Sequence, residues 1–252
     1  MDILLNILAL IGAVILGGSI VAIANAYQQK NIIKILLAFS GGFMLAIAFN
    51  HFLPELYASH SSYIGIYIIL GFLIQLVLEY FSGGIEHGHI HVHNGNAMPW
   101  MMFISLSVHS FIEGIPLAIH SEAVDMVHDI AAHHHEHVHT HISSNSLLLG
   151  IIFHQTPVAI ALMTVLKASG FKNTKAWMVL LLFACMTPMG MLFGYVTEGK
   201  LGSLNMDILL AVVVGMFLHI STTIIFEASE NHRFNIIKLA SILVGVSLGL
   251  LL

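Results

Sequence analysis

Three residues able to bind a metal ion lie in two neighbouring apolar stretches of the chain. His109 and Glu113 stand four positions apart in residues 107–116, and His154 lies in the next stretch. In a helix, positions i and i+4 share one face, so His109 and Glu113 can point at the same ion. Two imidazoles and a carboxylate with open positions suit zinc, and also iron(II), manganese or cobalt. The spacing therefore predicts a divalent-metal site.

Three alternative roles for these residues are compatible with the same spacing. An ionisable side chain inside a membrane costs at least about 2.5 kcal/mol on insertion scales, so it needs a partner or a function. The three residues could hydrogen-bond one another and only hold two helices together, although such contacts usually use Ser, Thr or Asn. They could serve an intramembrane zinc-dependent hydrolase, but the chain has no His-Glu-x-x-His motif. A sensor or scaffold would bind metal without moving it.

The composition places these residues in a lipid bilayer. Of 252 residues, 58% are hydrophobic and 8% charged, which leaves too little polar surface for a water-soluble fold. The eight Lys and Arg residues provide no basic face for nucleic acid. The single Cys185 excludes both an intramolecular disulfide and a cysteine-based metal site. We therefore expect an all-α polytopic protein of the cell (plasma or inner) membrane.

Apolar stretches long enough to cross about 30 Å of hydrocarbon recur along the chain. They predict eight transmembrane helices in one transport domain, 1–252, over Ile3–Ala24, Ile32–Leu56, Tyr63–Phe81, Met98–Ile119, Ser146–Lys167, Ala176–Val196, Ile208–Glu227 and Ile236–Leu252. Seven of the eight Lys and Arg residues then fall on the side opposite the termini, so the positive-inside rule puts both termini outside. At this topology, Glu113 lies about 10 Å, His154 about 12 Å and His109 about 16 Å from the outer helix ends. The three ligands can meet at one depth.

Weaker signals surround this predicted site. An inner loop (84–97) and an outer loop (120–145) are rich in His, which is typical of metal-gathering tracts. Gly42–Glu55 and Gly215–Glu227 are faintly alike in opposite orientation, as in an inverted repeat. His51 and His219 either line a pathway or sit in polar pockets. Glu79, near an inner helix end, either has a role or extends its carboxylate to the membrane surface.

Several of these motifs together resemble the zinc- and iron-regulated transporter-like (ZIP) family, over essentially the whole chain. Residues 38–55 resemble the family's second helix, and 215–218 resemble part of its seventh. His109–Gly114 resembles the family's fourth-helix motif, and His154–Pro157 resembles the start of its fifth-helix motif. The His-rich loop after the third predicted helix fits as well. The resemblance implies a transporter and not an enzyme, with no resident cofactor. Its cargo is a divalent metal, zinc foremost, with iron, manganese and cadmium as further candidates.

The same resemblance implies movement of metal toward the cytoplasm by an elevator-type alternating-access mechanism, often in a homodimer. Helices 1, 4, 5 and 6 would slide against the others. It also implies that Ser110 and Gln155 belong to the metal site. The family commonly carries Asn where this chain has Ser110, a carboxylate where it has Gln155, and a Glu or His where it has Val158. We therefore predict one bound ion where the family pattern can build two adjoining sites.

Overall fold

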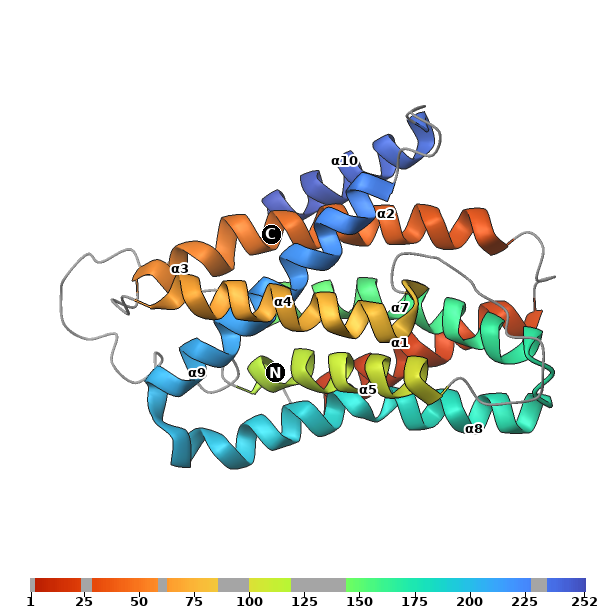
Figure 1. The fold of residues 1–252 in the computed structure, drawn as a ribbon, viewed down its shortest axis with the longest axis horizontal. Coiled ribbons are helices and arrows are strands. Elements are labelled where there is room, and N and C mark those ends of the chain that lie inside the picture. The colour runs from red at the N-terminus through yellow and green to blue at the C-terminus, as the bar shows by residue number, and fades with distance from the viewer. Residues whose placement is uncertain (1–2, 24–28, 59–62, 86–99, 119–143, 228–234) are drawn as a thin grey trace.

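The computed structural model describes residues 3–23, 29–58, 63–85, 100–118, 144–227 and 235–252, and this part of the chain is helical throughout (Figure 1). Its α-helices are α1 (Ile3–Ile23), α2 (Gln29–Ile47), α3 (Leu53–Ala58), α4 (Ile64–Ser82), α5 (Trp100–Gly114), α7 (Ser144–Ala168), α8 (Asn173–Ala184), α9 (Met186–Glu227) and α10 (Ile236–Leu251). A π-helix, η2 (Ala48–Phe52), joins α2 to α3, and a 3-10 turn, η4 (Ile115–Leu117), extends α5.

The lengths and composition of these helices confirm an all-α polytopic membrane protein. Within the described residues, seven helices are long and apolar enough to cross a bilayer, and α10 is a shorter apolar helix of 16 residues. Together they occupy the eight predicted stretches. Large apolar side chains such as Leu4, Ile69 and Val244 are exposed, as expected of lipid-facing surfaces.

Prolines explain the irregular turns in these helices. Pro54 has no N–H for the carbonyl four residues earlier, and the π turn η2 lies immediately before it. Pro116 likewise falls in the 3-10 turn that ends the helix of His109 and Glu113. Pro188 follows the break between α8 and α9.

One expected boundary differs from the structure. The sequence predicts separate helices over Ala176–Val196 and Ile208–Glu227, whereas α9 is assigned as one helical run of 42 residues. Residues 189–227 contain no proline, so no residue there prevents helical hydrogen bonding. Two membrane-length segments meet in this run: one, which includes α8, ends at Thr197, and the next begins at Asp207. The part of α9 up to Thr197 is its first segment and the part from Asp207 is its second segment, and Figure 1 shows the ribbon turning between them.

Pairs of glycines bring α2 and α10 into close contact. A Cβ atom at Gly42 would clash with the carbonyl oxygen of Ile242, and one at Gly245 with the carbonyl oxygen of Phe39. Each glycine therefore contacts the backbone carbonyl that lies three residues before the glycine of the facing helix. Side chains at these positions would force the helices apart, so the two backbones pack as one unit.

The contact between α4 and the second segment of α9 repeats this arrangement. A Cβ atom at Gly215 would clash with the carbonyl oxygen of Ile68, and one at Gly71 with that of Val212. Again each glycine meets the carbonyl three residues before its partner. The match between Gly42 and Gly215 supports the inverted repeat suggested by the sequence.

Close backbone contacts divide the described helices into two groups. The α2 group contains α2, α4, α10 and the second segment of α9, where Gly41 also meets Ile224. The α1 group contains α1, α5, α7, α8 and the first segment of α9, held by contacts such as Gly17 with the Thr156 carbonyl and Gly190 with the Phe111 carbonyl. Figure 1 shows α2 and α10 on one side of the molecule and α1, α5 and α8 on the other.

Candidate metal centre

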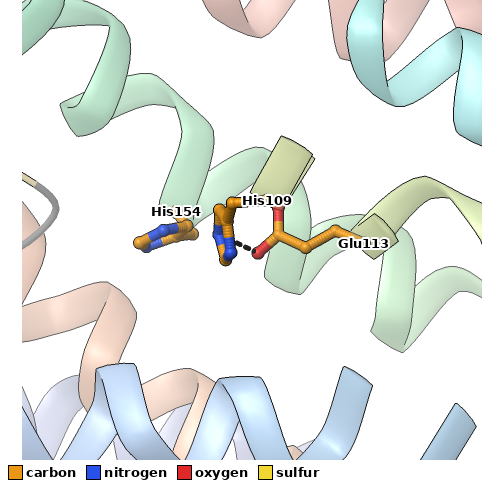
Figure 2. Close-up of side chains that lie close together, drawn as sticks. All are labelled: His109, Glu113 and His154. Carbon is orange, nitrogen blue, oxygen red and sulfur yellow. Dashed lines mark ion pairs between the residues drawn. The ribbon is translucent and has the colours of Figure 1, made fainter. Parts of the chain in front are cut away.

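The structure brings His109, Glu113 and His154 together at the contact between α5 and α7 (Figure 2). One candidate ligand atom from each residue lies within 4.8 Å of the others. The side chains are almost completely buried, with exposed fractions of 1% for each histidine and 0% for Glu113. The helical spacing explains the pair on α5, because i and i+4 side chains stack on one face. Three ligands at such distances can hold one metal ion.

The carboxylate of Glu113 lies in a site that favours a cation. Its Oε1 atom lies 2.8 Å from Nε2 of His109, the close contact drawn as a dashed line in Figure 2. Within the described part of the chain, neither carboxylate oxygen of Glu113 accepts a hydrogen bond. A buried carboxylate is costly unless positive charge compensates it. A metal ion bound by Glu113 would supply that charge.

His154 comes from the middle of α7 and faces His109. The two imidazole rings lie 5.8 Å apart between centroids, at an interplanar angle of 80°. Pro157, inside the same helix, has no N–H. The carbonyl of Phe153, the residue directly before His154, therefore lacks its usual helical hydrogen-bond donor. The ring of Phe153 packs edge-on against Phe43 of α2. The α7 side of the site therefore rests on the α2 group through side chains.

The predicted neighbours Ser110 and Gln155 are also buried. Ser110 is 1% exposed and Gln155 is 3% exposed. The Gln155 amide donates a hydrogen bond to the hydroxyl of Thr187, on the first segment of α9. That bond directs the amide nitrogen away from a ligand role, because a metal ligand must offer a lone pair. Metal binding by either residue remains a prediction.

Apolar clusters close the site at both ends along the helices. On α5, the proposed ligands His109 and Glu113 lie between Leu106 and Leu117. Leu106 belongs to the first apolar cluster, and Leu117, in the 3-10 turn, belongs to the second. On α7, His154 lies between Ile151 of the second cluster and Val158 of the first. Both clusters combine side chains from the two helix groups. The three proposed ligands are thus flanked by apolar side chains at both ends, and each is at most 1% exposed among the described residues.

Among the described residues, the other histidines and Glu79 lie outside this cluster. His219, on the second segment of α9, hydrogen-bonds Glu79 of α4 through Nε2. Glu79 thus has a protein partner, and its side chain is 22% exposed. His51 lies in η2, half-buried, with its Nε2 3.4 Å from the Asn50 amide nitrogen. Apart from residues 84–85 and 144–145, both His-rich loops fall outside the described residues.

Sequence reasoning missed one neighbour of the cluster. Gln75 of α4 is completely buried, and its Oε1 atom lies 2.8 Å from Nδ1 of His109. An amide in an apolar helix carries no charge and gives no metal-ligand pattern. Its partner is 34 positions away in sequence. The one available signal is an uncharged polar residue in the middle of a mostly apolar stretch.

The fold and this cluster define a polytopic membrane protein with a buried candidate site for a divalent metal. The family model described as "ZIP Zinc transporter" matches residues 83–252. The chain therefore belongs to the ZIP zinc transporter family, as the sequence motifs predicted.

Two relatives illustrate how far the similarity extends. Protein zntD of Dictyostelium discoideum is 26% identical over 175 residues, which cover 64% of this chain and 23% of that protein. Zinc transporter ZIP1 of Danio rerio is 24% identical over 173 residues, which cover 66% of this chain and 51% of that protein. The match therefore spans about half of one relative and about a quarter of the other.

Proposed function

We propose that this chain carries a divalent transition metal, zinc foremost, across the membrane through a site formed by His109, Glu113 and His154. The observation that carries the proposal is the convergence of these three buried ligands within 4.8 Å. Membership of a zinc transporter family supports transport as the activity, and it sets the intramembrane-hydrolase alternative aside. The name of the Danio rerio relative points to the same metal.

The ligand set suits an ion that must be bound and then released. Two neutral imidazoles and one carboxylate leave zinc with a formal charge of about plus one and at least one open position in a tetrahedral shell. Ser110, Gln155 and water would soften that charge by their dipoles. No second carboxylate belongs to the cluster among the described residues, which favours one ion over two.

The arrangement of helices supports alternating access. The ligands belong to the α1 group, and the apolar clusters that close the site lie between this group and the α2 group. Sliding one group past the other would open one cluster while the other stays closed. This motion corresponds to the elevator mechanism that the family resemblance implies.

Direction and orientation complete the proposal. We infer both termini on the outer face of the plasma or inner membrane, because seven of the eight Lys and Arg residues would then face the cytoplasm. Metal would move toward the cytoplasm, with the family as the basis for that direction. A homodimer is a further expectation of the same kind.

Metal flux in proteoliposomes tests the proposal. Purified protein is reconstituted, and uptake of zinc, iron(II), manganese and cadmium is compared with uptake into protein-free liposomes. We expect saturable uptake of zinc above the protein-free level, with the other ions as competitors. Zinc binding without any protein-dependent flux would instead identify a sensor or scaffold.

A further inference from the structure

A hydrogen bond crosses between the two helix groups and ends on a proposed metal ligand. Gln75 belongs to α4 in the α2 group, and His109 belongs to α5 in the α1 group. The Nδ1 atom of His109 donates to the Oε1 atom of Gln75 over 2.8 Å. Both side chains are buried, with exposed fractions of 0% for Gln75 and 1% for His109.

This bond decides which nitrogen of His109 can bind a metal. A neutral imidazole has one N–H and one lone pair, so donation from Nδ1 leaves the lone pair on Nε2. Nε2 is the atom that lies 2.8 Å from Oε1 of Glu113, at the metal site. An outer hydrogen bond of this kind fixes the tautomer and orientation of a metal-binding histidine.

The two ends of the hydrogen bond are held by different helix groups. Gln75 lies one turn from Gly71, whose backbone packs directly on Val212 of α9. Glu79, one turn further along α4, binds His219 of the same α9 segment. By contrast, Gly114, next to the metal ligand Glu113, packs on the carbonyl of Thr187 in the α1 group. Relative movement of the groups would therefore separate Gln75 from His109.

We propose that Gln75 is a positioning residue that strengthens metal binding at His109 in this arrangement and releases it when the helix groups slide. The proposal rests on the function proposed above. Metal affinity would then depend on the position of the groups, because one group supplies the ligands and the other supplies the acceptor that orients one of them. The bound metal ion can shift the equilibrium between the two arrangements only by the difference between its affinities for them.

The test measures zinc affinity in a loop-replaced protein, in which every His of residues 86–97 and 119–143 is changed to Ser. Gln75→Met keeps the side-chain length and removes the acceptor, and we expect zinc affinity to fall about 10- to 100-fold. Gln75→Glu keeps an acceptor, and we expect affinity at least equal to that of the parent protein. In transport assays, Gln75→Met should raise the half-saturating zinc concentration more than it lowers the maximal rate.

Ser105→Ala is the matched control. Ser105 lies one turn from His109 on α5 and donates to the carbonyl of Leu78 on α4, so its hydrogen bond joins the same two helices but ends on a backbone carbonyl and not on a proposed ligand. We expect its zinc affinity to match that of the parent protein. Equal affinity in Gln75→Met and the parent, or equal losses in the Met, Glu and Ser105→Ala proteins, would overturn the inference. If Gln75→Met does not fold, weaker binding by Gln75→Glu overturns it. Absence of zinc binding in the parent would refute the proposed site itself.

Discussion

Replacing Glu113 by Gln should abolish high-affinity zinc binding while preserving the shape of the site. Gln is nearly isosteric with Glu and retains one carbonyl oxygen, so the change mainly removes the negative charge. Glu113 is 0% exposed, and the other two ligands are neutral imidazoles when they bind metal. Zinc in the altered site would therefore retain its full double charge in a buried place where solvent cannot fully compensate for it.

The size of the effect follows from the charge and the burial. Removing one partner of a buried charge pair costs about 3–5 kcal/mol in measured cases. Because each 1.4 kcal/mol or so corresponds to a factor of ten in affinity, this loss should weaken zinc binding by about 100- to 3,000-fold.

Titration calorimetry with the loop-replaced protein measures this affinity directly. Glu79→Gln is the matched control, because Glu79 is also a carboxylate that binds a histidine on a membrane helix, yet it lies outside the cluster. We expect the control to change zinc affinity less than about tenfold. A Glu113→Gln protein that binds zinc as tightly as the Glu79→Gln protein would refute the assignment of Glu113 as a ligand.

Three further predictions concern the loops, the number of ions and pH. Changing the histidines of residues 133–141 to Ser should raise the half-saturating zinc concentration and leave the maximal rate unchanged, because a gathering loop raises local concentration only; a lower maximal rate at saturating zinc contradicts this. The loop-replaced protein should bind one zinc per chain, and two tightly bound ions that are both lost in Glu113→Ala would contradict it. Zinc affinity should weaken as the pH falls below about 6.5, the reference value for imidazole, because protons then occupy the ligand nitrogens; equal affinities at mildly acidic and neutral pH would argue against histidine ligands.

The sequence predicted the membrane helices well because hydropathy is a strong local signal. The first predicted stretch, Ile3–Ala24, corresponds to α1 at Ile3–Ile23, and the last one ends one residue beyond α10. The same signal contains no information on how a helix bends or continues. For that reason the π turn before Pro54 and the long run of α9 were found only in the structure.

The convergence of His109 and Glu113 could be predicted because both lie on one helix with a fixed period. The depth of His154 could be estimated from the rise per residue, but its approach to His109 depends on how α5 and α7 pack. Contacts between distant helices were missed for the same reason. Gln75 gives no charge signal, and Glu79 could not be paired with His219 without the packing of α4 on α9.

Zinc uptake into proteoliposomes by single Ala variants of the three ligands is the sharpest test of the proposed transport site. His109, Glu113 and His154 should each prove necessary, because solvent cannot fully replace a ligand that the ion loses in a buried site. His219→Ala is the control, because it removes a buried histidine outside the cluster. We expect this variant to retain uptake when its amount in the membrane matches that of the ligand variants. We predict uptake at the protein-free level for all three ligand variants, and near-normal uptake by His154→Ala would contradict the proposed site.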